Sequence, residues 1–304
     1  MKLVAALFVL FASAGVTAAP NAANPFVGRW DITLTTAKET LPDWLGVSEK
    51  AGKLEIWYQP PTANVYLVKD YKLNGSHLTL RLEKGITWEL DAVGDKLIGA
   101  QKRGSSVQGK VEGVRAAALS RDGVPAWTAP EPLFNGRDLT GWEPTSRSST
   151  SMWEARDGEL INRAKGANLK TSRQFRDFKL HIEYNCPSGG NSGIYLRGRY
   201  EVQVEYEPLE KNPPERRMGS IYGFLTPAVA LPRTPGAWES YDIALVGRTV
   251  TIVRDGALIL DRKEIPGITG GALDSREGDP GPLYIQGDHT GGLRFRNIAI
   301  ATAK

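Results

Sequence analysis

Short β-like runs separated by turn-forming residues fill this chain of 304 residues, and they constrain its fold more than any other feature. No stretch carries the 3.6-residue hydrophobic periodicity of an amphipathic helix over three turns. The chain is also rich in residues that favour turns and strands, with 33 Gly, 19 Pro, 8 Trp and 10 Tyr. We therefore predict an all-β protein, whose length allows two domains of ordinary size.

The first predicted unit, residues 24–119, has the pattern of a small antiparallel β-barrel or meander. Turn-forming pairs such as Asn74-Gly75 separate its runs, and Asn-Gly in this position is a strong hairpin signal. A Gly28-x-Trp30 motif resembles the first strand of lipocalin-like domains. The runs cover residues 26–34, 53–59, 65–73, 77–82, 87–90, 96–101 and 107–114. The tryptophans expected in the core are Trp30, Trp44, Trp57 and Trp88.

A second unit of similar character follows a proline-rich segment. Residues 120–132 contain three prolines and no periodicity, so we interpret them as a linker. Residues 133–304 contain about ten short runs, which predict a β-sandwich. These runs cover residues 153–154, 159–162, 178–184, 194–197, 200–206, 220–224, 238–246, 249–254, 283–286 and 293–300.

Residues 189–203 combine a glycine-rich turn with two strands whose faces differ in polarity. Because side chains alternate along a strand, Tyr195 and Arg197 share one face of the first strand. Glu201 and Gln203 share the polar face of the second strand. Two interpretations remain open: a half-buried antiparallel sheet with a wet outer face, or a ligand groove on the polar face.

The same separation of polar and apolar faces recurs in three other runs. Their polar positions are Lys179, His181 and Glu183 in one run, Tyr284 and Gln286 in another, and Arg294 and Arg296 in the last. Aromatic rings stack on sugar faces, and amides and carboxylates bind hydroxyl groups. Such a surface therefore suits a neutral, polyhydroxylated ligand.

Residues 1–19 have the features of a secretory signal peptide. Lys2 supplies the positive start, residues 3–11 are apolar, and residues 16–19 offer small side chains for cleavage. The apolar run is too short for a membrane span. No Cys follows it directly, so we expect no lipid anchor and predict a periplasmic or secreted protein.

Cysteine usage and charge narrow the classes further. Cys186 is the only cysteine, so an intrachain disulfide and a cysteine-based zinc site are both excluded, and we expect a buried structural thiol. The net charge is +4, and the basic residues form no polybasic run, so nucleic acid is not an expected partner.

The motifs of the second unit, taken together, resemble the 3-keto-disaccharide hydrolase domain family. They are LFNGRDLTGW at 133–142, Trp153 with DGEL at 157–160, Phe178, GNSGIYLR at 190–197, YEVQV at 200–204, GSIYG at 219–223, PGAWESY at 235–241, QGDH at 286–289 and RFRNI at 294–298. The resemblance implies a concanavalin-A-like lectin/glucanase jelly-roll sandwich. The small β unit in front of it also resembles one that precedes this domain in some members. Two features depart from the family pattern: Gly287 is inserted between Gln and Asp-His, and Glu207 follows where an Asp-containing loop is common.

The activity that this resemblance implies is cleavage of glycosides already oxidised at C3. A 3-keto group acidifies the proton on C2, a base removes it, and the enolate expels the group on C1. Water then adds to the resulting enone. Such a site needs a base near C2, donors for the enolate oxygen and an acid for the departing oxygen.

The resemblance also directs attention to particular residues. Glu201 or His289 is expected to be the base or acid, with Asp288 orienting His289. The expected sugar-binding residues are Asn191, Tyr195, Arg197, Gln203, Tyr222, Trp238, Gln286 and Arg296. A divalent metal held by Glu201, Asp288 or His289 is a further hypothesis.

Structural roles compete with these assignments. His289 is equally interpreted as a loop histidine with a structural hydrogen bond, Trp238 as a core residue and Arg296 as half of an ion pair on the sheet.

Two other functions remain open at this point. Glu201 and Glu205, with Gln203 between them, resemble the carboxylate ladder of sandwich-fold glucanases and raise the hypothesis of an ordinary glycoside hydrolase. Their Cα atoms would lie about 13 Å apart at the rise of a strand, whereas retaining chemistry needs carboxyl groups about 5 Å apart. A non-catalytic, lectin-like carbohydrate-binding protein is the other alternative, because a fold does not imply a function.

Overall fold

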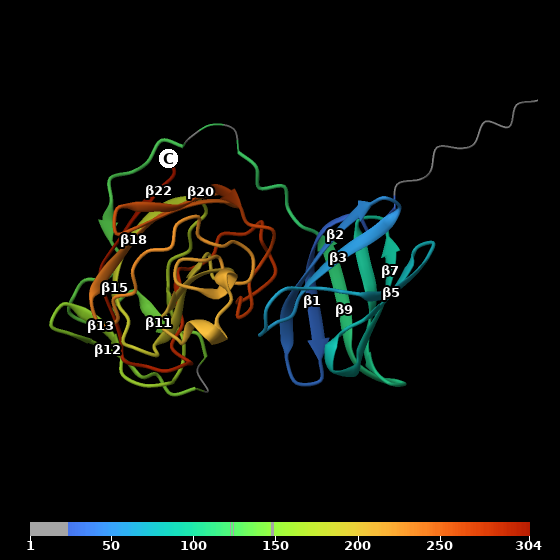
Figure 1. Ribbon diagram of the computed structural model, residues 1–304, viewed down its shortest axis with the longest axis horizontal. Helices are drawn as coiled ribbons and strands as arrows, with labels where there is room; N and C mark the ends of the chain where they lie inside the picture. The colour runs from blue at the N-terminus through green and yellow to red at the C-terminus, as the bar shows by residue number, and fades with distance from the viewer. Residues whose placement is uncertain (1–23, 122, 124, 147–148) are drawn as a thin grey trace, which may run out of the picture.

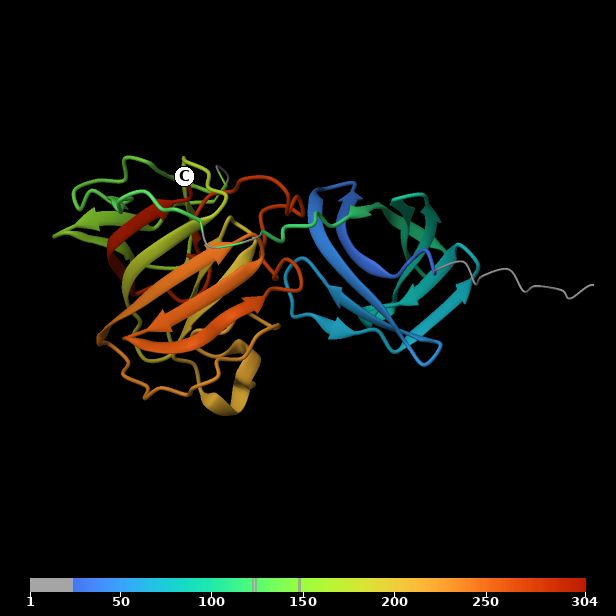
Figure 2. The same cartoon turned by 90° about the horizontal axis from the view of Figure 1, so that it is seen from above.

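The computed structural model describes residues 24–121, 123, 125–146 and 149–304, so the predicted signal peptide lies outside the described residues. The described residues form 22 strands in three sheets, which confirms the all-β prediction. Three single-turn 3₁₀ helices accompany them: η1 (Glu83–Gly85), η2 (Leu209–Lys211) and η3 (Pro214–Arg216). Figures 1 and 2 show the strands in two groups that lie side by side. Within this part of the chain, no helix has the length and hydropathy needed to cross a bilayer.

The first group is a nine-stranded antiparallel sheet with the order β4-β3-β2-β1-β9-β8-β7-β6-β5. Its strands are β1 (Gly28–Thr36), β2 (Thr40–Lys50), β3 (Lys53–Gln59), β4 (Tyr66–Leu67), β5 (Asp70–Asn74), β6 (His77–Arg81), β7 (Ile86–Val93), β8 (Lys96–Arg103) and β9 (Ser106–Arg115). Because β1 pairs with both β2 and β9, the strands that come first and last along this part of the chain are neighbours in the sheet. The sheet wraps around one core.

The tryptophans of this group do not all lie in that core. Trp30 and Trp88 are fully buried in it, as predicted. Trp44 is buried as well, but it packs into the core of the second group. Trp57 is 39% exposed, contrary to the prediction, and its Nε1–H donates to Glu55.

Part of the predicted linker lies against the second group. Trp127 forms a β-bridge with Ala303, and β10 (Glu131–Pro132) pairs with the last strand of the chain. Lys179 of that group also lies 5.3 Å from the ring centre of Trp127. Pro132 therefore sits in a strand at a sheet edge, where the lack of an N–H group costs little.

The second group contains two packed sheets. The eight-stranded sheet has the order β12-β13-β22-β15-β18-β19-β20, with β10 beside β22, and the five-stranded sheet has the order β11-β14-β21-β16-β17. The first contains β12 (Trp153–Arg156), β13 (Glu159–Asn162), β15 (Phe178–Asn185), β18 (Trp238–Val246), β19 (Thr249–Arg254), β20 (Ala257–Glu264) and β22 (Leu293–Thr302). The second contains β11 (Trp142–Pro144), β14 (Leu169–Thr171), β16 (Asn191–Leu196), β17 (Tyr200–Glu205) and β21 (Tyr284–Ile285). One apolar cluster, which includes the buried thiol of Cys186, fills the space between them and confirms the sandwich.

Most of the polar face of β16 and β17 is buried, so the first of the two interpretations, a half-buried sheet with a wet outer face, is wrong. Every residue of β17 is buried. Residues 219–222 pair along its free edge, with Gly219 N donating to Gln203 O and Tyr222 N donating to Glu201 O. Residues 269–271 cover the polar face, where Thr269 Oγ1 accepts the N–H of Glu201.

Residues 220–224, predicted as a strand, form a turn closed by isolated bridges of Ile221.

The two groups share buried contacts. The Trp44 ring meets Phe224 edge-to-face at 5.6 Å, and a Cβ added to Gly267 would come within 2.3 Å of Trp44. Beside this contact, Glu277 N donates to Asp31 Oδ2 at 3.4 Å. Apolar and polar groups of the first sheet are thus buried against the sandwich.

Candidate active site

A polar cavity of about 170 Å³ lies on the outer face of the five-stranded sheet. Strand pairing builds it: Tyr195 lies opposite Glu201, Gly193 lies opposite Gln203, and Tyr284 pairs with Tyr195 from the other side. The predicted residues that line the cavity are Asn191, Tyr195, Glu201, Gln203, Tyr222, Gln286, Asp288 and His289.

Two stacked tyrosines form one surface of this cavity. The rings of Tyr195 and Tyr284 lie 4.1 Å apart and are nearly parallel, at 10°. Burial raises the pKa of both phenols well above its ordinary value, so both remain neutral donors. Tyr284 was not among the predicted site residues. The alternation of polar and apolar side chains along its strand, with Tyr284 opposite in direction to Ile285, was the signal that would have identified it.

Glu201 lies at the base of the cavity and is only 3% exposed. Burial raises the pKa of its carboxyl to about 8, with a contribution from the charge of Asp288, and both outweigh the contact with Tyr195. The hydroxyl of Tyr195 lies 2.8 Å from Gly270 O and 2.9 Å from Glu201 Oε2. Tyr195 has one proton for these two oxygens, so both contacts are satisfied when a protonated Glu201 donates to Tyr195 and Tyr195 donates to Gly270 O.

The absence of a side chain at residue 193 makes room for this carboxyl. A Cβ built on Gly193 would lie 2.1 Å from Glu201 Oε1 and 2.7 Å from Glu201 Cδ. The carboxyl of Glu201 therefore leans along the sheet over its neighbouring strand.

Asp288 and His289 form a hydrogen-bonded pair beside the cavity, and both side chains are about half exposed. Nδ1 of His289 lies 2.8 Å from Asp288 Oδ1, so the ring donates its Nδ1 proton to this carboxylate, and the neutral form of the ring carries its lone pair on Nε2. Burial raises the pKa of Asp288, but the hydrogen bond from His289 opposes this effect, and the net pKa lies below its ordinary value.

Asn168 holds the loop that carries this pair, since its Oδ1 accepts the N–H groups of Gly287 and Asp288. Asn168 also lines the cavity, and no sequence motif pointed to it.

Two buried carboxamides line the cavity without a partner for their oxygens. Gln203 is 2% exposed and Gln286 is 8% exposed, and Oε1 of each makes no hydrogen bond. Because an unpaired buried polar group costs about 1–3 kcal/mol, such groups are typical of a binding site that a ligand completes.

Three predicted site residues lie outside this cavity. Arg197 adopts φ 53°, which ends the strand alternation, and its guanidinium donates to Tyr200 Oη and Gly247 O. Trp238 and Arg296 belong to the eight-stranded sheet. There Arg296 pairs with Glu183 at 2.6 Å and lies 4.0 Å over the Trp238 ring, so the ion-pair alternative for Arg296 is the one observed.

Glu205, the second carboxylate of the glycosidase alternative, also lies outside the cavity. It is fully buried and accepts hydrogen bonds from the N–H groups of Glu207 and Met218 and from Asn212. These contacts give Glu205 a structural role.

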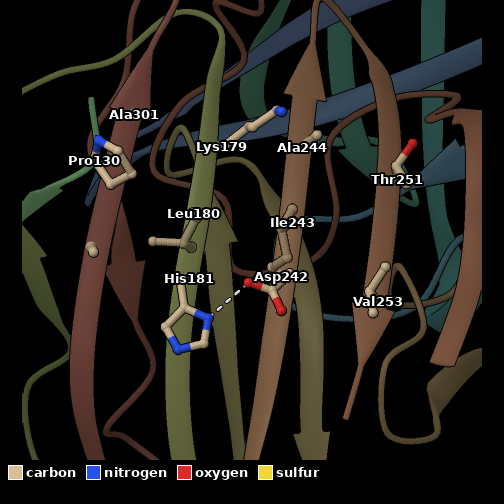
Figure 3. A pocket seen from close by; sticks show the side chains of 11 residues that line it. Pro130, Lys179, Leu180, His181, Asp242, Ile243, Ala244, Thr251, Val253 and Ala301 are labelled. Carbon is tan, nitrogen blue, oxygen red and sulfur yellow. Dashed lines mark hydrogen bonds and ion pairs between the residues drawn. The ribbon is translucent and has the colours of Figure 1, made fainter. Parts of the chain in front are cut away.

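A larger hollow of about 370 Å³ lies on the outer face of the eight-stranded sheet (Figure 3). Small side chains such as Ala244 and Ala301 create it. Its principal charged groups satisfy each other, since His181 Nδ1 lies 2.7 Å from Asp242 Oδ1. Of these two hollows the smaller is therefore the stronger candidate, because the buried side-chain oxygens of Gln203 and Gln286 that line it lack partners.

Among residues 24–121, 123, 125–146 and 149–304, no three His, Cys, Asp or Glu side chains lie close enough together to form a metal site. The metal hypothesis for Glu201, Asp288 and His289 thus gains no support from their positions.

An all-β sandwich with a buried acid, an imidazole and free carboxamides in one cavity has the properties of a carbohydrate-active protein. Residues 129–301 match the family described as the 3-keto-alpha-glucoside-1,2-lyase-like domain. The chain belongs to this family, as the motifs of the second unit implied.

A curated 3-keto-disaccharide hydrolase of Bacteroides thetaiotaomicron is 25% identical in an alignment 154 residues long, and the match covers 39% of this chain and 53% of that protein. The match therefore spans about half the length of the relative. A solved structure of a candidate glycosyl hydrolase from Parabacteroides distasonis has 29% identity and a TM-score of 0.49, and covers 60% of this chain and 94% of its own. A solved structure of a carbohydrate-binding module of Bacillus subtilis has 12% identity and a TM-score of 0.32. It covers 53% of this chain and 94% of its own. Both TM-scores are too low to carry an argument about function.

Proposed function

We propose that this protein cleaves 3-keto-glycosides by removing the C2 proton, eliminating the group on C1 and adding water to the product. One observation carries the proposal: the buried carboxyl of Glu201, whose pKa burial raises to about 8, lines the same small polar cavity as the imidazole of His289, which is hydrogen-bonded through Nδ1 to Asp288. These two groups are the acid and the base that the elimination requires.

In the elimination, Nε2 of His289 removes the proton from C2, and the electron pair of that C–H bond passes into the C3 carbonyl as an enolate. The enolate then forms the C1–C2 double bond while the C1–O bond breaks. Glu201 donates its proton to the departing oxygen, so an alcohol leaves. His289 is now an imidazolium and Glu201 a carboxylate.

In the hydration, Glu201 takes a proton from water and the water oxygen bonds to C1 of the enone. The imidazolium of His289 returns a proton to C2. Both groups regain their starting protonation states, and the net reaction is hydrolysis of the glycosidic bond. Asp288 keeps the imidazole in one tautomer and stabilises its charged form.

The carboxamides supply the hydrogen bonds that this chemistry needs. Asn191, Gln203 and Gln286 donate to the enolate oxygen and accept from sugar hydroxyls, because a carboxamide has both kinds of group. The stacked pair of Tyr195 and Tyr284 and the ring of Tyr222 shape the sugar pocket.

The two rival functions are less well supported. A retaining glycosidase needs a second carboxylate close to Glu201, and Glu205 is committed to buried hydrogen bonds outside the cavity. A lectin has no need of a buried carboxyl with a raised pKa beside an oriented imidazole.

The test is turnover of a chromogenic 3-keto-glucoside beside its unoxidised parent, with and without a chelator. We expect release from the keto form only. Glu201→Gln and His289→Ala should each lower kcat by about 10²-fold or more. The matched control is His77→Ala, because His77 makes the same kind of contact, at 2.8 Å, with Asp91 in the first group. Release from the parent would support the glycosidase, and binding without release from either would support the lectin.

We also propose that the protein works in the periplasm or outside the cell, since its residues 1–19 have the pattern of a signal peptide. The substrate is then an oxidised sugar that is present in that compartment.

A further inference from the structure

The loop that joins β3 to β4 reaches from the first group of strands onto the cavity in the second. Gly271 N donates to Pro61 O at 2.7 Å. A Cβ added to Gly270 would come within 2.5 Å of Ala63 O, so the two backbones touch with no room for a side chain. Thr62, at the tip of this loop, lines the cavity.

The loop is held in its position from both sides. Within the first group, Gln59 is 1% exposed and its Nε2 donates to Pro60 O at 2.7 Å. On the other side, Val65 packs against the core of the sandwich. The loop is thus fixed to both groups.

The segment under the loop carries contacts of the candidate active site. Gly270 O accepts from Tyr195, and Gly271 O accepts from Tyr284 at 3.3 Å. The loop therefore rests on the backbone that holds the stacked tyrosines, and Tyr195 in turn contacts Glu201. Thr62 itself is exposed, in contrast to the buried residues at the base of the cavity, and so stands at the mouth.

We propose that the first group of strands completes the active site, with residues 59–65 forming one wall and Thr62 acting as a substrate-contacting residue that limits the size of the leaving group. This inference rests on the proposed function. The cavity of about 170 Å³ is smaller than the roughly 300 Å³ or more of common ligand sites, so it holds one sugar ring. The glycosidic oxygen must then lie within reach of Glu201, and the rest of the group attached to C1 must extend out through the mouth, where the Thr62 methyl and hydroxyl meet it.

The experiment compares kcat/KM for a methyl and a 4-nitrophenyl 3-keto-glucoside in Thr62→Ala, Thr62→Trp and the full wild-type chain. The control is Ser105→Trp, which places the same ring on an exposed turn between β8 and β9 of the same group. We expect Thr62→Trp to lower the ratio of the large to the small substrate by about tenfold or more, and Thr62→Ala to raise it. If the two Thr62 variants show the same ratio of large to small substrate as Ser105→Trp, the inference is overturned.

A second measurement decides the matter if no keto-glycoside is turned over, which would refute the proposed function. Carbodiimide labels protonated carboxyls, and mass spectrometry of the peptide carrying Glu201 reports its access from solvent. A wall formed by the loop predicts faster labelling in Thr62→Ala, slower labelling in Thr62→Trp and no change in Ser105→Trp. Equal labelling in all four proteins would then overturn the inference as well.

Discussion

Replacing Gly193 with alanine tests the geometry of Glu201 without removing any functional group. Gly193 does not have the positive φ that favours glycine, so alanine adds no backbone strain. Its Cβ would lie 2.1 Å from Glu201 Oε1 and 2.6 Å from Cγ, whereas ordinary contacts begin at 3.4 Å. The carboxyl oxygen must therefore withdraw by more than about 1 Å, since the strand pairing holds both backbones in place.

The size of the effect follows from this displacement. A misplacement of about 1 Å in a catalytic group costs roughly 10²-fold in rate. We expect Gly193→Ala to lower kcat by that amount and to have a smaller effect on KM. Overpacking should also cost about 1–3 kcal/mol of stability, because neighbouring side chains must shift.

The assay is steady-state turnover of the 3-keto-glucoside, with thermal unfolding followed in parallel. Gly278→Ala is the matched control, because its added methyl would meet only Ala117 Cβ, at 3.2 Å. In a Glu201→Gln background the alanine should have little further effect, since both changes act through one carboxyl. A full additional loss in that background, or a Gly193→Ala enzyme with normal kcat, would refute the reasoning.

Three further predictions concern the candidate active site and the buried Asp31 of the first group. With Glu201 as the acid, kcat/KM should fall about tenfold per pH unit above about pH 8, where the carboxyl loses its proton; a rate that is level to pH 10 would contradict this role. Asp288→Asn should lower kcat through a disordered imidazole and leave sugar binding, measured by calorimetry, nearly unchanged; equal losses in both would point to a structural role. Burial and the nearby charge of Glu277 raise the pKa of Asp31 from 3.8 to about 8, so the folded state keeps a proton that the unfolded state releases. The free energy of unfolding of the wild type should therefore decline as pH rises from about 4 to about 8. Measured by urea unfolding, the stability of Asp31→Asn relative to the wild type should increase between about pH 5 and about pH 8. A difference in stability that does not change with pH would disprove the raised pKa.

Local pattern was enough to predict much of this protein. The two-residue alternation along a strand depends only on neighbouring residues, so it placed Tyr195, Glu201 and Gln203 on one face before any tertiary contact was known. Dense turn residues and the lack of helical periodicity predicted the all-β class in the same way. The joint motifs of residues 133–300 predicted the family.

The same reasoning failed where a single residue broke the local rule. At Arg197 the left-handed backbone, followed by Gly198, turns the side chain away from the face that alternation assigns to it. The strands β2 and β20 were not predicted, because Pro42 and Gly46 in one, and the charged end of the other, interrupt the pattern.

Only the tertiary structure decided which polar residues meet. Trp238 and Arg296 have the same alternating pattern as the cavity residues, yet they lie on the other sheet, and pattern does not say to which sheet a strand belongs. The raised pKa of Glu201 comes from its burial, and residues far along the chain contribute to its surroundings, since Thr269 Oγ1 accepts its N–H. Thr62 reaches the cavity from a separate group of strands. Contacts between distant segments leave no periodic signal, because each depends on the shape of the whole fold.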